Sequence, residues 1–143
     1  MRTITLALFG LLVIGTAAAV QANDDIFILK STDKTPEAVV EAVKAHSERM
    51  QWRYIGDSKI KKGEVTLVKV CVPTVGQAVW PAGLKLSAML PCGNLGIYRS
   101  GDMTEISLLH PRYMSILYPH PATEEAGEIA LPLLVEMLDA VTR

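Results

Sequence analysis

The sequence predicts an α+β domain with helices on one face of a mostly antiparallel sheet. Short apolar or alternating stretches, typical of strands, lie before and after one amphipathic helical stretch, and a second helical stretch follows them. Two of the later strand stretches are joined by a short polar turn, which favours antiparallel pairing. The resulting order of strand, helix, several strands and helix is that of an α+β fold.

The first 22 residues have the anatomy of a secretory signal peptide. Arg2 gives a positive start, residues 5–14 are almost wholly apolar, and a small-x-small cleavage pattern ends at Ala22. The apolar run is shorter than the ~20 residues that a bilayer span needs. We therefore expect cleavage after Ala22, export to the bacterial periplasm, and no stable membrane insertion afterwards. The mature chain, residues 23–143, is the size of one α+β domain.

The charge balance argues against one class of partner. Removal of Arg2 leaves 13 basic against 15 acidic side chains, a net charge of −2. A chain with no basic excess has nothing to attract a phosphate backbone, so nucleic acid is not an expected partner.

A strand and a helix open the domain. Residues 26–29 form a short apolar run that predicts a strand, and residues 31–34 predict a turn. Thr35-Pro36-Glu37 then has the pattern of a helix start, with Thr as N-cap and Pro at the first helical position. The helix is expected to run to about Met50. Its apolar stripe includes His46, which we interpret as a core histidine with one satisfied hydrogen bond.

Several strands follow this helix. Residues 52–55 predict a strand that Gly56-Asp57 breaks, and residues 61–63 predict a turn. Residues 64–72 are the strongest strand candidate, because apolar and β-branched side chains fall on one face at every second position. Pro73 has no N–H to donate and is expected to end this strand.

The second half of the chain predicts two helices and a hairpin. Residues 74–80 predict a short helix. Residues 94–99 and 103–109 predict a hairpin closed by Ser100-Gly101-Asp102. The chain is helical again from Thr123, and Pro132 within that stretch predicts a kink or a start nearer Leu131.

Two short cysteine-proline motifs carry a resemblance to a known family. A strand ending in Cys71-Val72-Pro73 is followed by a short helix and by Met89-Leu90-Pro91-Cys92. The hairpin Ile97 to Leu109 and then Pro111 come next. In this order and spacing, and with the Thr-Pro-Glu start of the first helix, residues 26–140 resemble domain-of-unknown-function family 302.

The resemblance implies a fold and no chemistry. The fold is β-α-β4-α, with a curved antiparallel sheet similar to that of the TATA-binding protein. The resemblance also implies a homodimer, and the family has no assigned activity. Two positions depart from the family pattern. Val72 stands where the family usually has Asn, and the first helix ends without the usual Gly.

The two cysteines, Cys71 and Cys92, admit three interpretations. An even count in an oxidising compartment favours a disulfide, which would close a loop of roughly 20 residues and stabilise the fold by ~3 kcal/mol. Cys71 also precedes a predicted helix start, where backbone N–H groups favour a thiolate. The pair could then bind a soft metal or haem iron, or exchange with sulfur compounds. The third interpretation is two small buried side chains.

His110 and Met114 are the other candidate ligands. They lie four residues apart and would face one side if Pro111 opens a helical turn. Together with a thiolate they would suit copper or haem, although the chain has no Cys-x-x-Cys-His motif for covalent haem. The alternative is a turn histidine and a core methionine. The ligand-binding or redox candidates are thus Cys71, Cys92, His110 and Met114.

These observations favour an exported module that binds a small ligand, haem or a metal. The sequence shows no Ser-His-Asp order, phosphate loop or zinc spacing, so an ordinary enzyme has little support. Two alternatives stay open: a thiol-based redox or sulfur-handling protein, and a structural or partner-binding domain. We expect a homodimer and a small-molecule ligand.

Overall fold

The computed structural model describes residues 26–89 and 94–143. Five strands form one sheet in the order β1-β5-β4-β3-β2, and every neighbouring pair is antiparallel. The strands are β1 (Phe27–Thr32), β2 (Arg53–Ile60), β3 (Val65–Cys71), β4 (Asn94–Ser100) and β5 (Met103–Leu109). The predicted α+β class is confirmed.

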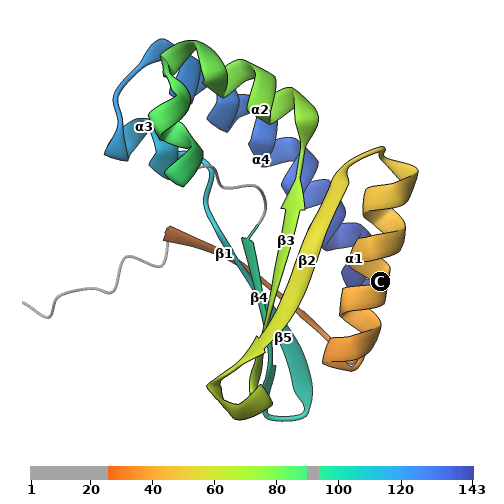
Figure 1. The fold of residues 1–143 in the computed structure, drawn as a ribbon. Coiled ribbons are helices and arrows are strands. Elements are labelled where there is room, and N and C mark those ends of the chain that lie inside the picture. The colour runs from red at the N-terminus through yellow and green to blue at the C-terminus, as the bar shows by residue number, and fades with distance from the viewer. Residues whose placement is uncertain (1–25, 90–93) are drawn as a thin grey trace, which may run out of the picture.

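Two long helices cover one face of this sheet (Figure 1). They are α1 (Pro36–Arg49) and α4 (Pro121–Thr142). Shorter elements gather beyond the ends of the strands and form what we call the lobe (Figure 1). The lobe consists of α2 (Pro73–Val79), the 3-10 helices η3 (Trp80–Ala82) and η4 (Leu84–Ala88), and α3 (Tyr113–Leu117). Among the described residues, no helix has the length and apolarity that a membrane crossing requires.

The core lies between the sheet and the two long helices. From β3, β4 and β5 it receives alternate side chains that are almost fully buried: Val68, Val70, Leu95, Ile97, Ile106 and Leu108. Helices α1 and α4 contribute the facing side chains, among them Val39, Val43, Leu134 and Met137. This alternation places the other half of each strand's side chains on the opposite face of the sheet.

The start of α1 follows the predicted pattern. The Thr35 hydroxyl accepts a hydrogen bond from the Ala38 N–H at 3.2 Å, and Pro36 occupies the first helical turn. This cap satisfies one of the donors that every helix start leaves unpaired. His46 is buried on the same helix, and its ring nitrogen Nδ1 lies 2.8 Å from the Arg49 guanidinium. The predicted core histidine with one satisfied hydrogen bond is therefore confirmed.

Two of the predicted strands are longer than expected. β1 continues to Thr32, through the start of the predicted turn, because it pairs with β5 along its whole length. β2 does not break at Gly56-Asp57. The pairing register shifts between Tyr54 and Gly56, so one extra residue is absorbed as a bulge and the strand continues to Ile60.

The final helix also differs from the prediction. α4 begins at Pro121 and runs without interruption through Pro132 to Thr142. His120 is its N-cap, and its Nδ1 accepts a hydrogen bond from the Ala122 N–H at 3.1 Å. Pro132 is tolerated because it and Glu128 lie on the exposed side of the helix. Water can therefore satisfy the Glu128 carbonyl that loses its helical partner.

Candidate functional site: the open face of the sheet

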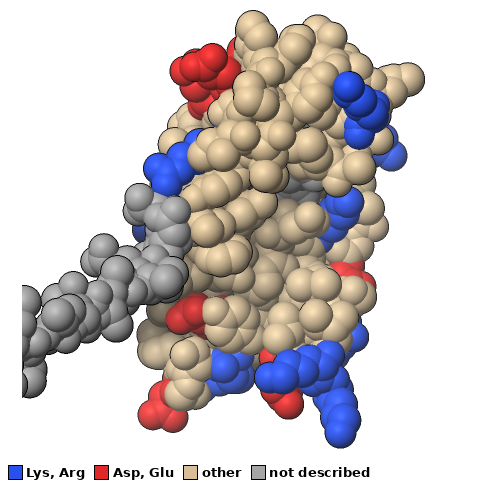
Figure 2. All heavy atoms as spheres, turned by 90° about the vertical axis from the view of Figure 1, so that its left-hand side faces the viewer, with Lys and Arg blue, Asp and Glu red and all other residues tan. Residues whose placement is uncertain are grey.

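The face of the sheet opposite α1 and α4 carries large apolar side chains that no described element covers. We call it the open face. The register places on it seven of the most exposed large apolar residues: Phe27, Leu29, Ile55, Ile60, Leu67, Met103 and Leu109. Figure 2 shows this face as mostly uncharged, with a hollowed centre and charged side chains toward its margins. Apolar side chains gathered on one open surface typically mark a binding or interaction site.

A groove of about 490 Å³ crosses the open face where β2, β3 and the start of β4 meet. Its lining includes Ile55, Leu67, Lys69 and Asn94. The volume falls within the range of ordinary small-molecule sites, which are mostly apolar with a few polar groups. Ile55 projects into this region because it is the extra residue of the β2 bulge.

Gly96 lies beside this groove and, having no side chain, leaves the open face recessed at its position. It lies opposite Leu67 in the β3–β4 pairing and opposite Ser107 in the β4–β5 pairing. A Cβ atom at Gly96 would lie 2.8 Å from the Ser107 hydroxyl oxygen, which is too close for an ordinary contact. The position therefore has no space for a side chain unless Ser107 moves.

The open face carries more basic than acidic side chains at the described strand positions. Lys69 and Arg53 are exposed on it, and neither forms an ion pair with a described residue. Among the open-face positions of the five described strands, Glu105 is the one acidic residue. The Tyr98 hydroxyl donates a hydrogen bond to its carboxylate. This hydrogen bond is the main reason why the pKa of Tyr98 is raised above its ordinary value. An anionic group on this face would thus meet two cations that have no ion-pair partner among the described residues.

Cys71 lies on the open face between these two cations. It is partly buried at the end of β3, with Arg53 directly opposite on β2 and Lys69 two residues away on the same face. Val72 and Pro73 follow; the strand ends before Pro73 as predicted, and α2 begins at Pro73, one residue earlier than expected. Cys92, and with it the proposed disulfide to Cys71, lies outside the described residues.

The structure separates the other two candidates. Met114 is buried in the core cluster, on the short helix α3. His110 lies at a small surface depression whose lining includes Arg112, Glu124 and Glu128, and Met114 does not contribute to it. The His110 Nδ1 accepts a hydrogen bond from the Arg112 N–H at 3.2 Å. Within residues 26–89 and 94–143, no group of three or more His, Cys, Asp or Glu side chains could hold a metal ion.

His46 is a buried histidine on the covered side of the sheet. It is 2% exposed and its ring packs edge-on against Trp52, with 5.3 Å between the ring centroids. Burial lowers the pKa of His46 below its ordinary value, and the Arg49 charge acts in the same direction. Its Nε2 atom has no hydrogen-bond partner among the described residues. These properties belong to the core rather than to the groove.

Sequence reasoning missed the open face as a site. Residues 64–72 showed one face of apolar and β-branched side chains and a second face that includes Leu67 and Lys69. A strand with apolar side chains on both faces predicts burial on both faces. The sequence feature that could have identified the open face is Lys69, which lies on the same face of the strand as Leu67. A charged side chain among apolar ones indicates a face that solvent or a ligand can reach.

The described residues form an α+β fold whose sheet has one covered and one open face. A crystal structure of an uncharacterized conserved DUF302 protein from Bacillus stearothermophilus shares this fold. The similarity has a TM-score of 0.72 at 16% sequence identity and covers 82% of this chain and 98% of that chain. The chain is therefore a DUF302-like domain in its fold, as the cysteine-proline motifs suggested. No protein-family model matches the sequence, and no curated protein matches it.

Proposed function

We propose that this domain is an exported binding module whose site is the open face of the sheet. Its ligand is an apolar molecule that carries an anionic group. The observation that supports this proposal most directly is the groove lined by Ile55, Leu67 and Lys69, in a face whose exposed side chains are mostly apolar. Burying one leucine-sized side chain against a ligand contributes about 1.5–3 kcal/mol, so a few contacts are enough for micromolar affinity.

Arg53 and Lys69, with which no described residue forms an ion pair, would favour a ligand with an anionic group. A carboxylate or sulfonate at the end of the groove would replace water around them, and a hydrogen bond to a charged group is stronger than a neutral one. Ligands of this class include fatty acids and haem, whose propionates are anionic. Haem would bind here through its apolar ring and its propionates, and the proposal assigns no iron ligand.

The proposal is tested with an anilinonaphthalene sulfonate probe, which has an apolar body and one anionic group. Fluorescence titration of the mature chain should show saturable binding. Leu67→Glu should weaken it by at least about tenfold, because it removes an apolar contact and places a like charge near the sulfonate. Lys69→Gln should weaken it less.

Leu84→Ser is the matched control, because Leu84 is an exposed leucine of the lobe and not of the open face. It should leave probe binding unchanged. Equal loss in Leu84→Ser and Leu67→Glu, or unaltered binding in Leu67→Glu, would contradict the placement of the site. Titrations with haem and with a long-chain fatty acid, each as a competitor of the probe, then distinguish the two kinds of ligand.

We propose that a second copy of the chain covers the margin of the open face away from the groove. There β1 is an edge strand with unpaired backbone groups, and Phe27, Leu29 and Leu109 are exposed beside it. Such an edge favours pairing with another chain, and a two-fold axis makes the same patch serve both copies. Sedimentation should show a dimer that Leu29→Lys dissociates, whereas Lys69→Gln leaves it intact.

A second candidate function is thiol chemistry at Cys71. The observation that favours it is the position of Arg53 directly opposite Cys71, with Lys69 on the same face. These cations would hold an anionic sulfur compound beside the thiol. Alkylation of Cys71 should then abolish turnover of such a compound, while Cys71→Ser keeps probe binding. Mass spectrometry of the exported protein gives the cleavage point and the state of Cys71 and Cys92 together.

A further inference from the structure

The three most exposed large apolar side chains of the described chain lie on the lobe and not on the open face. Leu84 is 79% exposed, Leu117 68% and Ile116 58%, whereas Leu67 on the open face is 42% exposed. They come from two separate short helices, η4 and α3. Three aliphatic side chains that protrude this far are unusual for a surface that faces only water.

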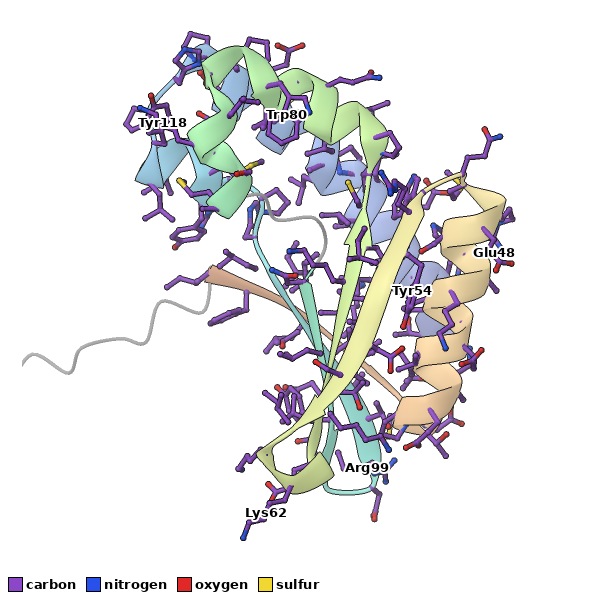
Figure 3. The ribbon with its side chains drawn as sticks, viewed as in Figure 1. Glu48, Tyr54, Lys62, Trp80, Arg99 and Tyr118 are labelled. Atoms are coloured by element: carbon purple, nitrogen blue, oxygen red, sulfur yellow. The ribbon has the colours of Figure 1, made fainter. Side chains whose placement is uncertain are left out.

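The two helices that carry these side chains are neighbours in space. The Lys85 ammonium of η4 lies over the ring of Tyr118, which follows α3 directly, at 4.9 Å from the ring centroid. This contact joins the segment after Leu84 to the segment after Leu117. The three protruding side chains therefore lie on two adjoining helices, and we call Leu84, Ile116 and Leu117 together the apolar tip. Figure 3 shows Trp80 and Tyr118 in the same lobe.

The lobe and the segments that flank it, residues 72–88 and 110–123, contain no Asp or Glu, and they include Lys85 and Arg112. Glu124 and Glu128 of α4 line one surface depression with Arg112 and with Ser115 of α3. Lys85, on η4, is not part of that depression. Trp80, Tyr113 and Tyr118 add aromatic rings with a polar edge, and Trp80 is partly exposed. Figure 2 shows the lobe as a largely uncharged surface with charged side chains at its margins.

We propose that the lobe attaches the domain reversibly to the surface of an anionic lipid bilayer. Leu84, Ile116 and Leu117 would enter the boundary of the acyl chains, while Lys85 stays at the level of the phosphate groups. Tryptophan and tyrosine favour this same interfacial depth, because their rings are amphipathic. Binding of this type depends on the buried apolar area and on the attraction of cations to anionic lipids.

The shape and composition of the tip favour a lipid surface over a protein partner. A protein interface typically has a flat or concave core in which aromatic side chains and arginine are enriched. Here aliphatic side chains protrude from two short helices, and no acidic side chain lies within the lobe elements themselves. With three inserted side chains, the affinity should be modest, comparable to a single myristoyl chain at about 10⁴ M⁻¹.

The test uses the mature chain, residues 23–143, and vesicles of phosphatidylglycerol and phosphatidylethanolamine. The protein should sediment with these vesicles, and less with pure phosphatidylcholine vesicles. The triple variant Leu84→Ser, Ile116→Ser, Leu117→Ser should lose at least about tenfold in binding. Lys85→Glu should weaken binding to the anionic vesicles alone.

Ile55→Ser with Leu67→Ser is the matched control, because it removes two exposed aliphatic side chains from the groove of the open face and none from the tip. It should sediment with vesicles as the unaltered chain does, although it loses the anilinonaphthalene sulfonate probe. The triple variant should show the reverse pattern. The two measurements therefore distinguish a failure of this proposal from a failure of the proposed ligand site.

Fluorescence gives a second readout. The chain has two tryptophans, Trp52 and Trp80, so Trp52→Phe leaves Trp80 as the reporter. On vesicle addition its emission should shift to shorter wavelength, and lipids brominated near the headgroup should quench it. Absence of both sedimentation and spectral shift would overturn the proposal. So would equal loss of vesicle binding in the control and triple variants, or full retention of vesicle binding by the triple variant.

Discussion

The two faces of the same sheet have opposite properties although they are built from the same five strands. Ile97 and Ile106 face each other across β4 and β5 on the covered face and are fully buried under the helices. One residue before and one after along those strands, Gly96 and Ser107 face each other on the open face. The comparison indicates that the covered face holds the fold together and that the open face is available for binding.

The largest expected effect tests the covered face. Ile97→Ala should reduce the free energy of unfolding by about 2–5 kcal/mol, because it removes buried methyl groups and leaves a cavity that the neighbouring side chains fill only in part. Denaturant titration followed by circular dichroism measures this loss. A change below about 1 kcal/mol would show that the covered face is not the main core.

A change at the start of a covering helix should have a smaller effect. Thr35→Ala removes the side-chain acceptor of the Ala38 N–H and should cost about 1 kcal/mol, in the range of other N-cap deletions. Thr35→Ser keeps the hydroxyl and serves as the control. If both variants lose equal stability, the methyl group of Thr35 and not its hydrogen bond is responsible.

Much of this covered architecture was predictable from the sequence. The Thr-Pro-Glu pattern located the start of α1, and Pro73 located the end of β3, because both signals depend on local backbone geometry. Local sequence signals predicted the wrong element lengths where contacts with other parts of the chain determine how far a strand or helix continues. The β3 pairing carries β2 through Gly56, and the exposed position of Pro132 lets α4 continue.

The arrangement of the candidate site residues was harder to predict than the fold. The four-residue spacing of His110 and Met114 suggested that the two side chains lie together. In the structure Met114 is buried in the core, whereas His110 lines a surface depression. The sequence correctly singled out Cys71 as a residue beside a helix start. It could not show that Arg53 lies opposite Cys71, because cross-strand neighbours depend on a register that the bulge in β2 alters.

The buried histidine gives the covered face a pH dependence that the open face should lack. Because burial lowers the pKa of His46, the unfolded chain binds this proton more readily than the folded chain. The contribution of neutral His46 to the free energy of unfolding is thus fully present above the unfolded-state pKa of about 6.5 and is lost as the pH falls below it. Arg49 adds to the lowering, and Glu136 on α4 opposes it.

The measurement is the urea midpoint at pH 7.5 and at pH 5.5, for the unaltered chain and for His46→Gln. The difference between the two pH values should shrink in the variant, which has no titrating ring at this position. An unchanged difference would assign the pH dependence to other groups. Lys69→Gln, on the open face, should leave the difference as it is.

The smallest effect on stability is expected on the open face itself. Leu67→Ser changes a half-exposed side chain, so the free energy of unfolding should change by no more than about 0.5 kcal/mol. Ligand binding should fall nevertheless. A loss of stability near that of Ile97→Ala would show that something already covers the open face in solution, and a dimer that dissociates in the same variant would identify it.

The division of the sheet into a structural and a binding face is tested most directly by two measurements on one variant. Leu67→Glu is titrated with the anilinonaphthalene sulfonate probe and unfolded in urea under the same conditions. The expected result is at least about tenfold weaker probe binding with a free energy of unfolding within about 0.5 kcal/mol of the unaltered chain. Unaltered probe binding, or a loss of stability that accounts for the loss of binding, would contradict it.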